Sequence, residues 1–173
     1  GNFCYLRTNY FLLMTIGVLK EQSPETRVSL LPEHIVILKK WNVDVSIESN
    51  AGVTAFAGDN KYAEAGATIK SRTEIFNESD ILLSINAPQQ SEVDDLQSKI
   101  FLGVYQPLFA PQQMQQWAIK GFTVFSMDML PRTTRAQSMD VLSSQANIAG
   151  YKAVLTAANL FPKYFPMFMT AAG

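Results

Sequence analysis

The sequence contains very few of the residues from which catalytic and metal centres are usually built. Its 173 residues include one cysteine, Cys4, and one histidine, His34. A disulfide within the chain therefore cannot form. With so few of these residues, we expect neither a zinc site nor a catalytic arrangement of the Cys/His or Ser/His/Asp type. We expect no metal site, and we expect His34 to lie at the surface of a helix.

Glycine is also scarce, and its positions exclude one common nucleotide-binding motif. The chain has nine glycines, and no two of them are separated by a single residue. The glycine-rich fingerprint that cradles a pyrophosphate group at a helix N-terminus is therefore missing. A dinucleotide that binds to this chain would need its phosphate site on another domain.

No basic or long apolar segment points to nucleic acid or to the interior of a membrane. The chain has 14 Lys and Arg residues against 15 Asp and Glu residues, and because no basic run occurs we expect no nucleic-acid partner. The apolar segment 11–19 is too short to span a bilayer. It also lacks the basic start and the small-residue cleavage site of a signal peptide. We expect no direct insertion of this chain into a membrane.

The composition is that of a globular domain. Hydrophobic residues make up 47% of the chain and charged residues 17%, which is typical of a protein with a folded core. Because Met14 is the first methionine and an apolar segment follows at once, we interpret residues 1–13 as an extension of uncertain origin and residues 14–173 as a domain. The chain stops at Thr170-Ala-Ala-Gly173 without a terminal strand or cap, so we expect it to be a fragment of a longer chain.

Short apolar segments alternate with helical ones along most of the chain. This alternation predicts an α/β fold, a three-layer sandwich with a mainly parallel sheet of the flavodoxin-like or Rossmann-like kind, ending in a long helix. The expected strands are Thr15–Leu19, Asp44–Glu48, Thr68–Lys70, Asp80–Asn86, Ile100–Tyr105 and Phe122–Met127. The expected helices are Pro32–Trp41, Asp59–Ala65, Thr73–Asn77, a short one to Leu96 capped by Ser91, Pro111–Ile119, and the long one to about Leu160.

Hydrogen-bonding side chains are concentrated just before and within this long helix. Pro131 opens a loop that carries two arginines, and Thr134 or Ser138 is expected to cap the helix, with Asp140 complementing the dipole in its first turn. Three polar residues then share one helical stripe: Asp140, Ser143 and Asn147. An ordinary capped helix with a polar outer face would give the same pattern, so the residues leave a structural and a functional interpretation open.

The order of residues in this stretch resembles a known family. Arg135-Ala-Gln-Ser-Met-Asp-Val-Leu-Ser-Ser-Gln-Ala-Asn-Ile-Ala-Gly-Tyr151 is similar to the signature of the NAD-binding alpha subunits of proton-translocating NAD(P) transhydrogenases, which are relatives of alanine dehydrogenase. The resemblance runs from Met14 to Gly173. Further motifs that carry it are Lys20-Glu21 with Glu25-Thr-Arg27-Val, Glu48-Ser-Asn-Ala-Gly52 and Ile85-Asn86-Ala-Pro88. The family implies that a Rossmann domain with the glycine-rich loop would follow, which this chain does not contain.

Two substitutions separate this chain from the alanine dehydrogenase branch of the family. That branch carries a catalytic lysine in a Lys-Glu-Pro context after the fourth strand, where this chain has Asn86. It also carries a catalytic histidine after the next strand, where this chain has Gln106 and no histidine nearby. Oxidation of an amino acid requires a general acid and base beside the imine carbon. Hydride transfer between two nicotinamides requires neither, so the substitutions favour transhydrogenase.

The resemblance implies roles for four residues in a cleft that holds the nicotinamide end of NAD(H). Arg132 would reach the carboxamide or ribose, and Gln137 would help to hold the two cofactors together. Asp140 and Ser143 would bind the nicotinamide and fix the orientation of its ring. Gln137 and Asp140 are the implied catalytic residues, because hydride transfer depends mainly on the positions of the two rings. Arg135 is expected to be structural.

The family also implies partners and a location. We expect hydride transfer from NADH to NADP⁺, with NADP(H) held in a partner component and proton translocation carried out by membrane-spanning components. The full subunit is expected to form a homodimer. It would lie on the cytoplasmic side of the inner or plasma membrane, or on the matrix face in mitochondria, and this chain alone is expected to be inactive. An NAD-dependent dehydrogenase of the alanine type and a non-catalytic interaction module are the alternatives.

Overall fold

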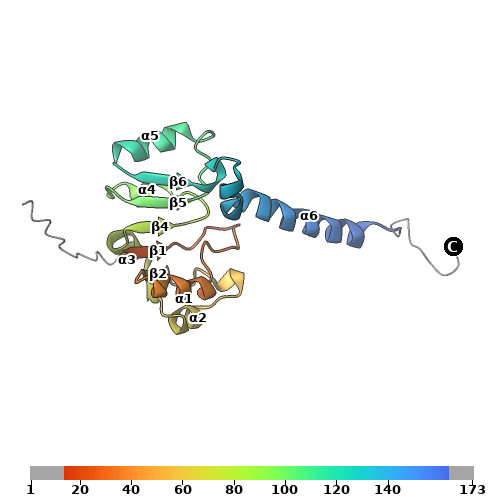
Figure 1. Cartoon of the computed structure of the whole chain (residues 1–173), viewed down its shortest axis with the longest axis horizontal. Helices are drawn as coiled ribbons and strands as arrows, with labels where there is room; N and C mark the ends of the chain where they lie inside the picture. Colours follow the sequence, from red (N-terminus) through yellow and green to blue (C-terminus); the bar gives the residue numbers. More distant parts are fainter. Residues whose placement is uncertain (1–13, 164–173) are drawn as a thin grey trace, which may run out of the picture. The chain divides into compact units, whose positions relative to one another are not determined.

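The computed structural model describes residues 14–163 (Figure 1). Contacts within the chain divide it into two compact units, unit 1 at residues 1–126 and unit 2 at residues 127–173. The expected extension at residues 1–13 and the Thr170-Ala-Ala-Gly173 motif lie outside the described residues.

Unit 1 is built around a six-stranded sheet in which all neighbouring strands are parallel. The strands are β1 (Thr15–Val18), β2 (Asp44–Glu48), β3 (Thr68–Lys70), β4 (Ile81–Leu83), β5 (Ile100–Gly103) and β6 (Thr123–Ser126). Their order across the sheet is β3-β2-β1-β4-β5-β6. This is the order of a doubly wound fold, whose direction of winding reverses between β1 and β4. The predicted α/β class is confirmed.

Helices cover both faces of this sheet. They are α1 (Pro32–Lys40), α2 (Asp59–Glu64), α3 (Arg72–Glu78), α4 (Gln90–Val93) and α5 (Pro111–Ile119), with a short 3-10 helix η1 (Val53–Ala55). The neighbours Leu82 and Leu83 of β4 point to opposite faces, as successive strand residues do. Leu82 belongs to a core cluster with Ile75 of α3 and Trp117 of α5, whereas Leu83 packs in a second cluster with Ile35 of α1. The three predicted layers are therefore present.

Local sequence explains where several helices begin and end. Pro111 opens α5, since proline suits the first helical position. Ser71 and Glu74 form a capping box at the start of α3, in which each side chain accepts a hydrogen bond from the backbone N–H of the other residue. Gly66 and Gly121 follow α2 and α5 with φ of 95° and 71°, a left-handed conformation that glycine adopts at little cost.

The fourth strand is shorter than predicted. β4 ends at Leu83 and does not continue to Asn86. The backbone N–H groups of Ile85 and Asn86 donate to the carboxylate of Glu21, at 2.5 and 3.1 Å. A side chain from the loop after β1 therefore replaces a strand partner at this point.

The short helix α4 begins differently from the prediction. Its cap is Gln89, and Ser91 lies inside the helix. Gln89 donates its backbone N–H to the carboxylate of Glu92 at 2.8 Å, so the capping box is shifted by two residues. The expectation of a Ser91 cap was wrong, because the acidic residue three positions after Gln89 completes the box.

Unit 2 contains two 3-10 helices, η2 (Met127–Met129) and η3 (Thr134–Met139), and the long helix α6 (Val141–Leu160). The predicted long helix is confirmed, but its predicted cap is wrong. Thr134 and Ser138 belong to η3, and the cap of α6 is Asp140. No helix within residues 14–163 is both long enough and apolar enough to cross a membrane.

Candidate functional site

A pocket of about 280 Å³ lies at the start of α6, within unit 2. All four residues to which the sequence assigned a cofactor-binding role line it: Arg132, Gln137, Asp140 and Ser143. Met127, Asp128 and Leu142 contribute to the same wall. Arg135 and Asn147 are not among the lining residues. The structure therefore brings together the four predicted residues and separates them from their two polar neighbours.

The backbone before α6 folds tightly around one small residue. The N–H of Thr133 donates to the carbonyl of Pro131 at 2.8 Å, and the N–H of Ala136 donates to the carbonyl of Thr133 at 3.0 Å. Ala136 is only 6% exposed, and it also lines the pocket. The side chain of the next residue, Gln137, is exposed in the pocket wall, where its amide can both donate and accept hydrogen bonds.

Asp140 has two partners within its own helix turn. Its carboxylate accepts a hydrogen bond from the backbone N–H of Ser143 at 2.9 Å and one from the Ser143 hydroxyl at 2.6 Å. These hydrogen bonds, aided by the positive charge of Arg132, hold the pKa of Asp140 below its usual range. Asp140 is thus a charged acceptor at the N-terminus of a 20-residue helix, and the helix dipole stabilises the same charge.

The four groups offer a consistent set of contacts for an uncharged amide. Arg132 supplies donors only, Asp140 supplies acceptors only, and Gln137 supplies both. A carboxamide group has one carbonyl acceptor and two N–H donors, so it can be oriented by such a set. The pocket contains no residue that would transfer a proton near neutral pH by its ordinary pKa. The arrangement is suited to positioning a ligand.

A second pocket, of about 460 Å³, lies in unit 1 at the carboxyl ends of β1 and β4. In open parallel sheets, ligands bind in the crevice where the winding reverses, and this pocket occupies that place. Charged residues contribute much of its lining: Lys20, Glu21, Glu25, Arg27 and Arg72. Asn86, at the position of the alanine dehydrogenase lysine, also lines it.

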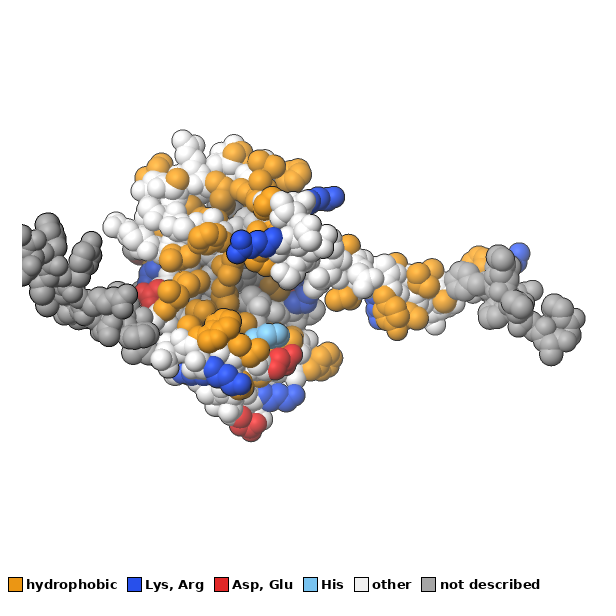
Figure 2. All heavy atoms as spheres, in the orientation of Figure 1, with side chains coloured by type: hydrophobic (Ala, Val, Ile, Leu, Met, Phe, Trp, Pro, Cys, Tyr) orange, Lys and Arg blue, Asp and Glu red, His pale blue; other side chains and the backbone are white. Residues whose placement is uncertain are grey.

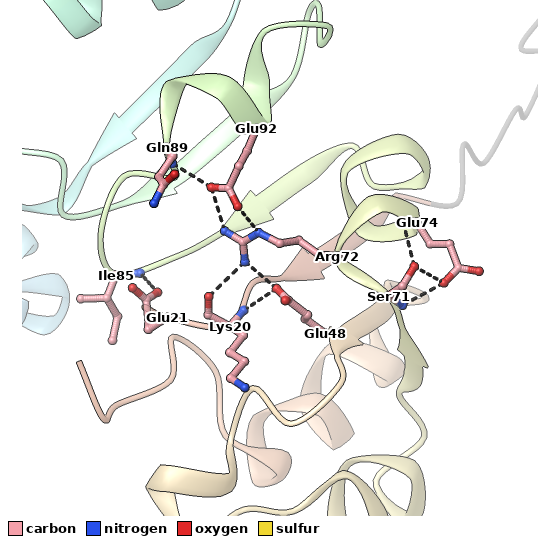
Figure 3. Close-up of polar contacts among 9 residues, drawn as sticks. All are labelled: Lys20, Glu21, Glu48, Ser71, Arg72, Glu74, Ile85, Gln89 and Glu92. Atoms are coloured by element: carbon pink, nitrogen blue, oxygen red, sulfur yellow. Dashed lines mark hydrogen bonds and ion pairs between the residues drawn. The ribbon is translucent and has the colours of Figure 1, made fainter. Parts of the chain in front are cut away.

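The Glu21 carboxylate accepts three hydrogen bonds from Ile85 and Asn86, two residues of the loop that follows β4. Besides the two backbone N–H groups of Ile85 and Asn86, its carboxylate accepts a hydrogen bond from Asn86 Nδ2 at 3.1 Å. Figure 3 shows the Glu21 side chain directed at the Ile85 backbone. Asn86 therefore acts within the structure as a donor to Glu21, and it has no titratable proton.

A cluster around Arg72 was missed by the sequence interpretation. Its Nη1 donates to Glu48 at 2.7 Å and to the carbonyl oxygen of Lys20 at 3.1 Å. Its Nε and Nη2 donate to the carboxylate of Glu92 at 2.6 and 3.2 Å. As Figure 3 shows, Arg72 lies between the two carboxylates and joins β2, α4 and the chain after β1. The only signal of this cluster in the sequence was Glu48, which lies within a family motif. Nothing near Glu48 points to Arg72, because the two residues are 24 positions apart.

The loop after β1 carries two cations, Lys20 and Arg27, and one of them forms an ion pair within the loop. Arg27 donates to Glu25 from Nε at 2.8 Å and from Nη2 at 2.6 Å. This pairing lowers the pKa of Glu25 to about 2. Lys20 makes no ion pair within residues 14–163. Among those residues no three His, Cys, Asp or Glu side chains lie close enough to hold a metal ion.

Comparison with known proteins relates the chain to two groups of enzymes. It is 37% identical over 163 residues to NAD(P) transhydrogenase subunit alpha of Cereibacter sphaeroides, a match that covers 92% of this chain and 31% of that protein. It is 38% identical over 162 residues to NAD(P) transhydrogenase subunit alpha of Haemophilus influenzae, with the same shares of the two chains covered. Alanine dehydrogenase of Staphylococcus epidermidis is 26% identical over 152 residues, which cover 87% of this chain and 41% of that protein.

Solved structures give the same relationship. The transhydrogenase from Sinorhizobium meliloti superposes with a TM-score of 0.83 at 37% identity, over 92% of this chain and 48% of that one. An L-alanine dehydrogenase superposes with a TM-score of 0.74 at 26% identity, over 84% and 40%. The chain thus spans about a third to a half of the length of these relatives. Residues 17–149 match the family described as alanine dehydrogenase/PNT, N-terminal domain, and this chain belongs to that family.

Proposed function

We propose that this chain is the N-terminal part of the NAD-binding alpha subunit of a proton-translocating NAD(P) transhydrogenase, with residues 14–173 forming its N-terminal domain. The reaction is direct hydride transfer from NADH to NADP⁺. Arg132, Gln137, Asp140 and Ser143 form the part of the site that holds the nicotinamide of NAD(H), and Gln137 and Asp140 fix the geometry of transfer. The remainder of the NAD(H) site, including the phosphate-binding loop, belongs to a Rossmann domain that follows in the longer subunit.

The observation that carries this proposal is the shared pocket of the four residues. They come from a loop, a 3-10 helix and the first turn of α6, yet they line a single cavity with complementary donors and acceptors. What supports the proposal is the chemistry of the set, since its donors and acceptors together match those of a carboxamide group. Hydride transfer gains mostly from holding two rings in contact at a fixed orientation, which such a set of fixed contacts can do.

The second pocket supports transhydrogenase over the alanine dehydrogenase alternative. Asn86 donates to Glu21, and neither it nor Gln106 can exchange a proton with an imine or amine at neutral pH. The sequence identities favour the same branch, since the two transhydrogenase subunits are 37% and 38% identical to this chain and the alanine dehydrogenase is 26% identical. Amino-acid oxidation therefore lacks its acid and base in this chain.

The proposal extends to the cofactors and the assembly. NAD(H) is held by this subunit, and NADP(H) is held by a separate component that presents its nicotinamide to the same cleft. Membrane-spanning components carry the protons, and the subunit lies at their cytoplasmic or matrix surface. The full subunit is a homodimer. The transhydrogenase relatives, which are named as alpha subunits, support a complex of several components.

The direct test is hydride transfer by the full-length subunit that contains this chain. The subunit is mixed with an NADP-binding component, and transfer from NADH to an NADP⁺ analogue is followed by stopped-flow absorbance. Transfer that depends on both components supports the proposal. Alanine-dependent reduction of NAD⁺ by the subunit alone, without transfer between the two dinucleotides, would overturn it in favour of the dehydrogenase. Neither activity, in a folded subunit that binds no NADH, would favour a non-catalytic interaction module.

A further inference from the structure

The polar residues of the pocket at the start of α6 can hold only one end of a nicotinamide. In the function proposed above, Arg132, Gln137 and Asp140 bind its carboxamide group. A single bond joins that group to the ring, so hydrogen bonds to the carboxamide leave the plane of the ring free to turn. Hydride transfer requires the ring itself to be held at a fixed angle. A further contact with the face of the ring is therefore needed, and an apolar side chain suits it because the ring carbons gain from close apolar packing.

Apolar side chains form part of the wall of this pocket. It is lined by four of them: Met127 of η2, Leu130, Ala136 of η3 and Leu142 of α6. η2 and α6 are in contact within unit 2. Ala136 is buried, and Met127 and Leu130 are partly buried, whereas Leu142 is 47% exposed. Among these four residues, Leu142 is thus the most open to a molecule that enters the pocket.

The helix turn that orients Asp140 also sets the position of Leu142. Asp140 caps α6, and Leu142 and Ser143 are the second and third residues of the helix. The hydrogen bonds from Ser143, and to a smaller extent one from the backbone N–H of Leu142, lower the pKa of Asp140. Successive residues of a helix are turned by about 100° about its axis. The leucine side chain is therefore held next to the polar groups of the pocket by the backbone of the helix.

Exposure of an apolar residue on α6 is not by itself evidence of a contact. Figure 2 shows several hydrophobic side chains at the surface of this helix. Leu155 is 48% exposed, nearly the same as Leu142, but it lies about 20 Å further along the helix axis. Among the described residues of α6, only Leu142 and Ser143 line the pocket. The place of Leu142 in the pocket wall, and not its exposure, distinguishes it from the other apolar residues of the helix.

We infer that Leu142 is a positioning residue for hydride transfer, whose side chain supports one face of the nicotinamide ring of NAD(H) while the polar residues hold the carboxamide. This inference rests on the proposed function and adds a contact to it. Packing of the leucine against the ring keeps the ring from tilting and leaves the other face for the acceptor. Without the leucine, the carboxamide still binds but the ring is loosely held. The expected consequence is slower transfer with little change in affinity.

A measurement without turnover tests the contact itself. The full-length subunit is labelled with ¹³C at its leucine methyl groups and saturated with NAD⁺, and the signals of Leu142 are assigned by their loss in Leu142→Met. Nuclear Overhauser effects should join the nicotinamide ring protons to the methyl groups of Leu142 and should be absent for Leu155. Bound NAD⁺ that gives no such effect at Leu142 would refute the contact.

Rates of transfer test the role of the contact. With the NADP-binding component present, Leu142→Ala should lower the rate of transfer from bound NADH at least about tenfold, and the dissociation constant of NADH should change by less than about threefold. Leu142→Met conserves the volume of the side chain and should keep the rate within about twofold of the natural subunit. Leu155→Ala removes the same atoms from an equally exposed residue and should leave the rate unchanged. Circular dichroism checks that each variant is folded.

The outcomes distinguish a failure of this inference from a failure of the proposed function. A natural subunit that neither binds NADH nor transfers hydride would overturn the proposed function and the contact with it. If the natural subunit transfers hydride and Leu142→Ala does so at the same rate, the proposed function stands and Leu142 has no positioning role. Equal losses in Leu142→Ala and Leu155→Ala would refute that role as well, because the effect would not depend on the pocket.

Discussion

Both carboxylate oxygens of Asp140 accept a hydrogen bond from Ser143, one from its backbone N–H at 2.9 Å and one from its hydroxyl at 2.6 Å. The Ser143 hydroxyl proton is therefore already committed within the helix turn. A carboxamide that enters the pocket meets an Asp140 whose orientation is fixed and whose remaining lone pairs are free to accept. The residue that caps α6 and the residue proposed to orient the nicotinamide are thus the same, which makes separation of the two roles an experimental question.

Substitution of Gln137 and Asp140 separates these roles. Gln137→Asn and Asp140→Asn, made in the full-length subunit and combined with the NADP-binding component, should each lower the hydride-transfer rate at least about tenfold, because small errors in ring position are costly. Asn at position 140 can still cap the helix, so the melting temperature should move by only a few degrees. Stopped-flow transfer between NADH and an NADP⁺ analogue gives the rate.

A neighbouring residue provides the control for that experiment. Ser138 lies between the two, does not line the pocket, and donates only to the carbonyl of Arg135 at 3.5 Å. Ser138→Ala should therefore leave the transfer rate within about twofold of the natural subunit. If Gln137→Asn and Asp140→Asn also transfer hydride at the rate of the natural subunit, the segment is only a capped helix and has no part in transfer.

The isolated chain should bind NADH weakly. The contacts proposed for its pocket are to the nicotinamide end alone, and the sequence has no glycine-rich loop for the pyrophosphate, from which much of the affinity for a dinucleotide comes. We expect a dissociation constant no better than about 1 mM by calorimetry. Micromolar binding by the 173-residue chain would show that the phosphate groups are held by residues of this chain after all.

Conversion of Asn86 to the lysine of the dehydrogenases should not create alanine dehydrogenase activity. In the structure this position faces the carboxylate of Glu21, so the amine of Asn86→Lys would form an ion pair there, and Gln106 still provides no histidine. The full-length variant should show no alanine-dependent reduction of NAD⁺ above the natural subunit, measured as absorbance of NADH. A robust rate in either protein would contradict the assignment to the transhydrogenase branch.

Loss of Arg72 should destabilise unit 1 more than loss of an ordinary surface lysine. Arg72→Met leaves Glu48 and Glu92, whose side chains are 12% and 23% exposed, without their cation. We expect a loss of about 1–3 kcal/mol in the free energy of unfolding, below the value for a fully buried pair because water still screens this one. Urea unfolding followed by the fluorescence of Trp117, which is buried in unit 1, provides the measurement.

The lysine of another ion pair serves as the comparison for Arg72. Lys70 pairs with Glu78 at 2.6 Å, and the Glu78 side chain is 54% exposed. Lys70→Met should change the free energy of unfolding by no more than about 0.5 kcal/mol. Equal effects of the two substitutions would show that the Arg72 cluster contributes no more than a surface pair.

The pairing of Glu25 with Arg27 predicts a dependence of stability on acid pH. The pKa of Glu25 is lowered from 4.5 to about 2 by hydrogen bonds from Arg27. A group whose pKa is lowered by folding contributes stability above its unfolded pKa and loses it as the pH falls through the folded pKa. The natural chain should therefore exceed Glu25→Gln in stability most above pH 4.5, and the difference should shrink toward pH 2. Urea unfolding across this range measures it, and a difference that does not vary with pH would exclude the ion pair as its cause.

The sequence by itself determined the parts of this protein that depend on neighbouring residues. The strands Asp44–Glu48 and Thr68–Lys70 and the helix Pro111–Ile119 have the predicted limits, because apolar periodicity and turn residues set them locally. The four pocket residues were predicted together from the family resemblance of the segment that contains them. They all lie within residues 132–143, so a loop and one helix turn suffice to bring them to one place.

Two kinds of feature were decided only by the tertiary structure. One is which of several suitable residues caps a helix, and the other is which distant side chains the strand order brings together. Asp140, Thr134 and Ser138 are all suitable caps by type, and the structure places Thr134 and Ser138 in η3 and Asp140 at the cap of α6. Glu21 meets Asn86 across 65 positions because β1 lies beside β4 in the sheet. Arg72 meets Glu48 and Glu92 across 24 and 20 positions for a related reason. No local pattern specifies such pairs, since they form only once the sheet has brought the ends of distant strands to one edge.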